Sequence, residues 1–258
     1  MAQESQNYTL GRGKVSFSRF KPGTQTPIGF KYIGNTPEFS LTIESENLDH
    51  FSSDEGIREK DDSVPLEVTR TGALTTDSIR PDNIAYFFFG TKDIVTQLAV
   101  PAADETFTDV EVGTQLKLGV TDANPAGYFG VTVVTVKVGA TAMVLGTDFT
   151  VNSKLGTVTI LEDGAIENGD DVIINFSVLA STRDRVQSGS TPVEGAMLYE
   201  ALNPKGKNFH YYLPYVKVTP NGDYNLKGDE WQVLPLSIEV LKPLMGEAIL
   251  MNGDPVFA

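Results

Sequence analysis

Alternation of apolar and polar residues, the period of a half-buried β-strand, dominates this chain. Strand signals occur at residues 15–18, 39–45, 64–70, 131–138, 146–151, 156–160, 171–178, 197–199, 210–213, 215–219 and 231–241. Turn-forming residues separate several of them, at 152–155, 203–208 and 220–223. Pro65 places its segment at a strand start or a sheet edge, because proline has no N–H for the hydrogen-bond ladder. The pattern predicts a mainly β protein.

One segment favours a short helix. Pro81 suits a first helical position, Asp82 suits the first turn and Gly90 suits the end. The aromatic run between them, residues 84–89, also fits a buried strand, and that alternative stays open.

Residues 98–182 differ from their flanks, because they are rich in Val and Thr and contain few basic residues. We predict a β-rich inserted region or subdomain there. Residues 1–97 and 183–258 then form the main domain, and residues 181–190 serve as a polar link. Extra strands that extend a single sandwich are the alternative.

Charge and cysteine content narrow the function. The formal net charge of −14 argues against a surface that grips nucleic acid or anionic lipid, since both need clustered Lys and Arg. Without cysteine there are no disulfides and no thiolate metal ligands. Residues 1–7 lack the pattern of a secretory signal, and no apolar stretch approaches the roughly 20 residues of a membrane span. We expect synthesis and folding in a cytosol.

Nucleotide-binding motifs are incomplete. Gly11-Arg12-Gly13 opens a dinucleotide fingerprint, but Ser16 replaces its third glycine. The pair Gly206-Lys207 occurs in a turn without the first glycine and the hydroxyl residue of a phosphate loop.

Metal and catalytic motifs are equally incomplete. Residues 223–228 begin like a calcium loop, but Lys227 takes the fifth position and Leu234 takes the place of the closing Glu. Neither His50 nor His210 has a nucleophile or a carboxylate at a motif spacing. We therefore predict no catalytic, cofactor-binding or metal-binding residues, and no enzyme.

Acidic residues concentrate between residues 44 and 62. The segment contains Glu44, Glu46, Asp49, Asp54, Glu55, Glu59, Asp61 and Asp62, the apolar residues Leu48, Phe51 and Ile57, and the basic residues Arg58 and Lys60. A solvated acidic loop is the simplest interpretation. Such a loop does not need apolar residues, however, and long ordered loops are often functional. We predict a long inter-subunit loop, with apolar anchors and with charges that set the register on a neighbouring copy. A glycosidase-like carboxylate pair would need a cleft, which the sequence does not show.

Several strings of residues resemble the tail tube proteins of long, non-contractile phage tails. They are residues 13–20, 34–39, 48–61, 212–216 and 231–241, with GKV, GNTPEF, LDHFSS and YLPYV among them. The resemblance covers residues 11–95 and 183–245, and the Val- and Thr-rich middle fits it less clearly.

The resemblance implies a tail-tube-type β-sandwich whose sheets join those of neighbours into a barrel. Subunits would form rings, usually hexameric, that stack through the long loop and the terminal arms. From their isolation within the acidic segment, we also expect Arg58 and Lys60 to pair with acids of the adjacent ring. The tube would enclose the tape measure protein, meet the tail terminator and tail-tip proteins, and conduct DNA without binding it. The protein would be a structural component of the virion tail and would need no cofactor.

Three other functions compete with this one. The first is the tube of a contractile tail or of a secretion apparatus. The second is a β-sandwich capsid or tail decoration or adhesion module, which would remain a discrete particle. The third is an acidic hydrolase, for which the sequence offers no motif.

Overall fold

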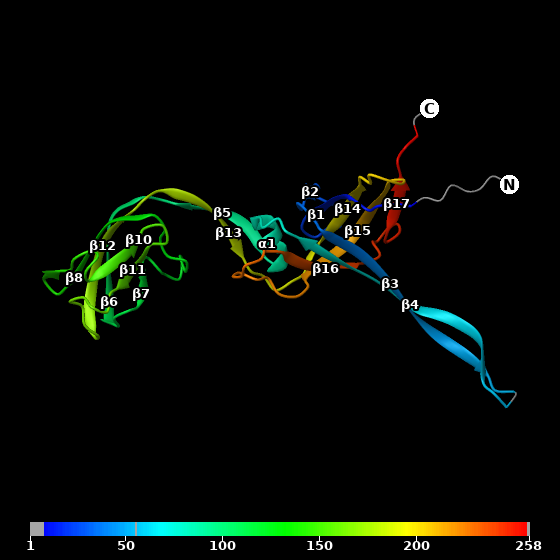
Figure 1. Ribbon diagram of the computed structural model, residues 1–258, viewed down its shortest axis with the longest axis horizontal. Coiled ribbons are helices and arrows are strands. Elements are labelled where there is room, and N and C mark those ends of the chain that lie inside the picture. Colours follow the sequence, from blue (N-terminus) through cyan, green and yellow to red (C-terminus); the bar gives the residue numbers. More distant parts are fainter. Residues whose placement is uncertain (1–7, 55, 257–258) are drawn as a thin grey trace. The chain divides into compact units, whose positions relative to one another are not determined.

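The computed structural model describes residues 8–54 and 56–256 (Figure 1). The expectations for residues 1–7 and for Glu55 therefore lie outside the described residues. Strands hold 54% of the residues and helix 3%, which confirms the predicted mainly β fold.

Two compact units divide the chain. Unit 1 takes in the described parts of Met1–Lys92 and Val186–Ala258, and unit 2 is Asp93–Arg185. The sequence pattern had indicated changes at 97/98 and 182/183. The chain passes from unit 1 to unit 2 through β5 (Thr91–Gln97) and returns through β13 (Ser181–Gln187), which pairs with β5.

The polar link expected at residues 181–190 is thus wrong, because most of it is strand β13. One of its charged side chains, that of Arg185, has its partner on β5. The guanidinium of Arg185 donates to both carboxylate oxygens of Asp93, at 3.1 and 2.6 Å. This ion pair holds the pKa of Asp93 below its usual range.

One eight-stranded antiparallel sheet forms unit 1. Its strands are β1 (Gly13–Arg19), β2 (Lys31–Tyr32), β3 (Glu38–Ser52), β4 (Glu59–Thr76), β14 (Val193–Ala201), β15 (Phe209–Pro220), β16 (Leu234–Val240) and β17 (Leu250–Gly253). The order is β2-β1-β14-β15-β16-β4-β3, and β17 pairs with the start of β15. The segments 210–213 and 215–219 are one strand, and β16 is followed by β17 instead of closing the sheet.

Alternate positions of these strands supply one apolar core, as period-two patterning requires. Val15, Phe17, Leu74, Met197, Leu213 and Ile238 are all nearly inaccessible to solvent.

Helix α1 (Pro81–Phe87) confirms the helical interpretation of residues 81–90. The ring of Tyr86 meets that of Phe17 edge to face, with centroids 5.0 Å apart, so the helix packs on the core. Gly90 closes the end of the helix, as predicted, because its N–H donates to the carbonyl of Ala85 at 2.7 Å. It is not, however, the residue with positive φ. Phe89 takes the left-handed conformation, with φ of 52°. Gly90 is needed for a different reason, because a Cβ there would lie 2.0 Å from the carbonyl oxygen of Gln187. Within the described chain, no helix has the length and apolarity to cross a bilayer.

Unit 2 contains two further sheets and its own core. Its strands are β6 (Val100–Val110), β7 (Gln115–Lys117), β8 (Val131–Val138), β9 (Thr141–Ala142), β10 (Phe149–Asn152), β11 (Thr157–Ile160) and β12 (Asp170–Val178). They form the sheets β6-β12-β8-β9 and β10-β11-β7. Leu118, Phe149, Ile160 and Ile174 are among the buried residues. In the described residues, these sheets share no strand with the sheet of unit 1.

The long loop predicted at residues 44–62 is wrong in conformation. β3 continues to Ser52 and β4 starts at Glu59, so residues 53–58 alone connect the two strands. The pairing runs without interruption by a loop from Glu38 opposite Thr75 to Ser52 opposite Glu59, with two bulges. Backbone hydrogen bonds between the strands do not depend on the charge of the side chains, which explains why an acidic segment still forms a hairpin.

Candidate assembly interface

β3 and β4 extend beyond the rest of the sheet as a two-stranded hairpin (Figure 1). β16 pairs with β4 only between Thr71 and Thr76. From Arg70 to Glu59, β3 is the only described strand that pairs with β4. We call residues 43–70 the arm.

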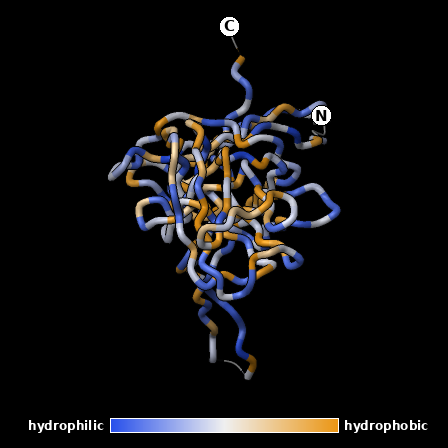
Figure 2. Tube along the Cα trace, turned by 90° about the vertical axis from the view of Figure 1, so that its left-hand side faces the viewer, coloured by the Kyte–Doolittle hydropathy of each residue, from blue (hydrophilic) through white to orange (hydrophobic). Residues whose placement is uncertain are grey.

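The arm exposes apolar side chains on both of its strands. Ile57, at the tip, is 76% exposed, and Leu48 and Leu66 are 61% and 63% exposed. The set comprises Ile43, Leu48, Phe51, Ile57, Val64, Leu66 and Val68. Figure 2 shows hydrophobic and hydrophilic stretches on both strands of the hairpin. The half-burial predicted for residues 64–70 is therefore wrong for Val64–Val68. An isolated two-stranded hairpin is marginally stable in water, and exposed apolar side chains on it make the arm a candidate contact surface.

Asp49 links the two strands of the arm. Its Oδ1 lies 2.6 Å from Nζ of Lys60, and the hydroxyl of Ser63 donates to the same oxygen at 2.7 Å. Hydrogen bonds from Lys60 and Ser63 lower the pKa of this carboxyl. Lys60, expected to pair across rings, thus already has a partner in its own chain. Whether it also meets an adjacent ring stays a prediction.

Near the tip of the arm, two further contacts link residues at the end of β3 with residues at or just before the start of β4. Nδ1 of His50 lies 2.6 Å from Oδ1 of Asp61. The guanidinium of Arg58 lies over the ring of Phe51, 5.2 Å from its centroid. Both pairs are exposed, so each contributes little to stability and mainly sets the geometry of the tip.

One face of the arm combines an apolar pair with unbalanced acids. Leu48 lies opposite Val64, and two residues earlier Glu46 lies opposite Glu67. Residues directly opposite each other in an antiparallel pair share a face, and like charges there repel. A partner with an apolar patch and a basic rim would relieve this repulsion.

The structure gathers most of the predicted site residues onto this hairpin. Those not yet placed lie on it with exposed side chains, namely Glu44, Asp54, Glu59 and Asp62. Glu55 lies outside the described residues. Sequence reasoning missed Val64, Leu66 and Val68 as surface residues. The alternation was visible, but nothing in it reveals that β4 has no cover on either face there.

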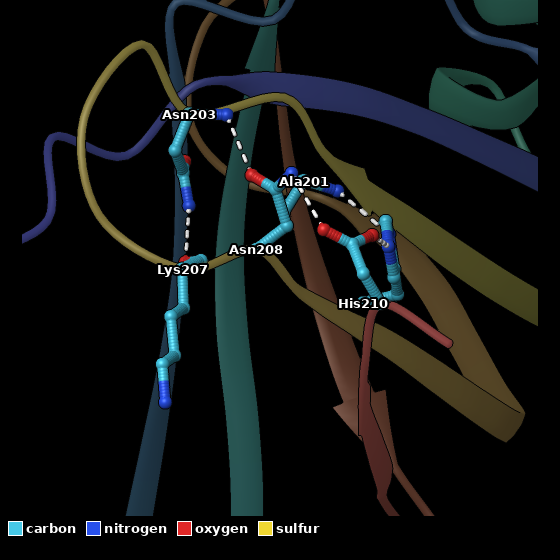
Figure 3. Close-up of polar contacts among 6 residues, drawn as sticks. Ala201, Asn203, Lys207, Asn208 and His210 are labelled. Atoms are coloured by element: carbon cyan, nitrogen blue, oxygen red, sulfur yellow. Dashed lines mark hydrogen bonds and ion pairs between the residues drawn. The ribbon is translucent and has the colours of Figure 1, made fainter. Parts of the chain in front are cut away.

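A second polar cluster joins the β14–β15 turn to the C-terminal strand (Figure 3). Nε2 of His210 lies 2.9 Å from Oδ1 of Asp254, and the backbone N–H of Ala201 donates to Nδ1 at 3.2 Å. Asn208 donates to the other oxygen of Asp254 at 3.0 Å. Both imidazole nitrogens are therefore engaged within the fold, and the pair acts as a structural contact. Among the described residues, no three His, Asp or Glu side chains group together as metal ligands.

These features define a class of protein: a mainly β chain of two units, one of which carries a long exposed hairpin. The chain belongs to the family described as Protein of unknown function UCP028589, whose model matches residues 8–244. That match includes the whole arm and the whole of unit 2. No curated protein matches the sequence.

Proposed function

We propose that this chain is the major tail tube protein of a long, non-contractile phage tail. It is a structural, non-enzymatic virion protein that polymerises as stacked rings, on the family pattern hexameric, into the hollow tube through which DNA passes. Unit 1 is the tube-forming domain, and the arm is the contact between successive rings.

The arm is the observation that carries this proposal. Its apolar side chains are exposed on both strands. Glu46 of β3 lies opposite Glu67 of β4, and the two like charges repel each other. A second copy of the chain that covers the arm would remove both the exposure of the apolar side chains and the repulsion between the two glutamates. If the surface that receives the arm lies elsewhere on the neighbour, the contact is heterologous. Such heterologous contacts generate rings and filaments.

The sheet of unit 1 supports the proposal through its edges. β3 is the last strand on one side and the two-residue β2 is the last on the other. Unpaired strand edges pair readily with other chains, and closure into a ring removes them. The formal charge of −14 suits a wall that phosphate passes without sticking.

The partners follow from the resemblance. They are further copies of this chain, the tape measure protein inside the tube, and the tail terminator and tail-tip proteins at its ends. DNA transits without specific binding, and neither a cofactor nor a membrane is involved.

Unit 2 favours a second candidate function. Because it has a core of its own, it suits a capsid or tail decoration or adhesion module, and that module would remain a discrete particle.

Negative-stain electron microscopy over a concentration series separates the two functions. We expect hollow filaments or stacked rings from the wild-type protein. Ile57→Asp, at the exposed tip, should raise the concentration needed for assembly roughly tenfold, because it places a charge in the contact. Leu155→Asp in unit 2 is the matched control, since Leu155 is also exposed, and should assemble like the wild type. Discrete particles at every concentration, even with the tail-tip complex added, would favour the decoration or adhesion module.

A further inference from the structure

The single tryptophan of the chain lies almost fully in solvent. Trp231 is 94% exposed, in the connection between β15 and β16, which also exposes 74% of Leu226. Two acids, Asp229 and Glu230, precede it directly. Tryptophan is the residue type most enriched among the few that dominate protein interfaces. Trp231 therefore has the properties of an interface anchor residue, but its own chain does not bury it.

Unit 1 also has an apolar groove of the kind that receives an anchor residue. It has a volume of 420 Å³ and is lined by Phe39, Leu41, Ile43, Tyr199, Tyr211 and Ile249. A second hollow of 480 Å³ shares Phe39 and Tyr199 with it and is lined also by Arg12. The two hollows therefore adjoin, and we call them together the β3 groove. Their volumes lie in the range of sites that enclose a large organic group.

One basic side chain lines the β3 groove, and a second belongs to the residue opposite one of its lining residues. Arg12 lines its polar half, and Arg70 lies opposite Ile43 in the strand register. Among the described residues that line the two hollows, Arg12 is the one charged residue. The acids before Trp231 complement it, so the two surfaces match both in polarity and in charge.

We propose that Trp231 of one copy inserts into the β3 groove of a second copy, with Asp229 and Glu230 directed at its basic border. This inference rests on the proposed function, since it assigns a contact between subunits in addition to the arm. Trp231 does not fill the groove of its own chain, because it is exposed and lies beside Asp77 and Ile79. The β15–β16 connection lies next to α1, whereas β3 leads away from α1 into the arm (Figure 1). Anchor and groove share no residue, so one copy can offer its anchor to one neighbour and its groove to another, and a contact made in this head-to-tail way propagates along a ring or a filament.

The lone tryptophan reports directly on this contact. We expect its emission maximum to shift to shorter wavelength, and its quenching by acrylamide to fall several-fold, when the wild-type protein assembles. Trp231→Ala should raise the concentration needed for assembly roughly tenfold or more, as loss of an anchor residue does. Arg12→Glu, at the border of the groove, should also weaken assembly and leave the tryptophan exposed. Lys154→Glu makes the same change of charge in unit 2, at an exposed site, and should behave like the wild type.

The outcomes separate this inference from the proposed function. Tubes or rings in which Trp231 remains fully quenchable would overturn the inference and leave the proposed function standing. Equal weakening by Arg12→Glu and Lys154→Glu would do the same, because a general charge effect would then explain both. If sedimentation shows no self-association of the wild-type protein under any condition, both proposals fail together.

Discussion

At the scale of single residues, the carboxylate of Asp254 makes two contacts with residues far away in the sequence. It pairs with His210 and accepts from Asn208, and so ties the segment after β17 to the start of β15. Hydrogen bonds from His210 first, and then from Asn208, hold the pKa of Asp254 below its ordinary value. A depressed pKa in the folded protein means that folding favours the charged carboxylate.

The stabilisation from Asp254 should therefore be complete above the ordinary aspartate pKa of about 3.9 and should disappear as pH falls through the lower folded value. Hydrogen exchange of the β17 amides at a series of pH values measures this. We expect β17 to lose protection in acid before the centre of the sheet does. Asp254→Asn should reduce the protection at neutral pH and remove its pH dependence. The same pH dependence in Asp254→Asn as in the wild type would contradict the prediction.

The roles of two buried polar residues, Asn83 and Gln97, could not be predicted from the sequence pattern. Asn83 is 2% exposed and donates to the carbonyls of Ile33 and Ser78, both at 2.7 Å. Gln97 serves unit 2 in the same way, through the carbonyls of Phe129 and Leu179. The sequence pattern singled out neither residue. Their partners come from distant segments, so only the folded chain reveals that they satisfy buried backbone groups.

At the scale of elements, strand β8 contains a strained bulge. Asn175 lies opposite Thr135 and Ser177 opposite Thr132, so Val133 and Val134 together face one residue of β12. Val133 has φ of 51° and is 77% exposed. The left-handed region is unfavourable for a β-branched residue, and an exposed side chain offers little packing in return.

Val133→Gly should therefore stabilise unit 2 by about 1 kcal/mol, because glycine adopts positive φ without the Cβ clash. Differential scanning calorimetry measures the change in the unfolding transition. Thr135→Gly is the matched control, since Thr135 is exposed in the same strand without positive φ, and it should destabilise. If both variants destabilise equally, the bulge carries no strain.

The sequence predicted the centres of the buried strands well and the acidic strands poorly. Residues 131–138 and 171–178 form β8 and β12, because unbroken apolar alternation marks a strand in a core. β6, the outer part of β3 and residues 59–62 of β4 were missed or interpreted as a loop, whereas residues 64–70 of β4 were predicted as a strand. Their acidic residues signal solvation, and solvation is compatible with a strand that projects from a sheet. Composition reports the surroundings of a side chain, whereas pairing depends on the partner strand.

At the scale of the whole molecule, the two cores are independent. No residue of the unit 1 core comes from Asp93–Arg185, and no residue of the unit 2 core comes from outside it. The arm, Trp231 and the β3 groove all belong to unit 1. If tube assembly depends on these surfaces, unit 2 is dispensable for it.

This separation leads to a deletion that tests the division of labour. Replacing Asp93–Arg185 with an Asn-Gly turn joins Lys92 to Val186, and such a turn suits the antiparallel pair β5–β13. The shortened chain should keep the fold of unit 1, because its core is intact, and should assemble at about the wild-type concentration. Circular dichroism checks the fold, and negative-stain microscopy checks assembly.

The complementary variant removes the arm and keeps unit 2. Replacing residues 46–67 with the same turn shortens β3 and β4 but leaves the pairing of β4 with β16 untouched. This variant should fold and fail to assemble. A unit 2 deletion that folds but stays discrete would instead place an essential subunit contact in unit 2. Unit 2 would then have a role in the wall of the assembly, and the arm, Trp231 and the β3 groove would not suffice for tube formation.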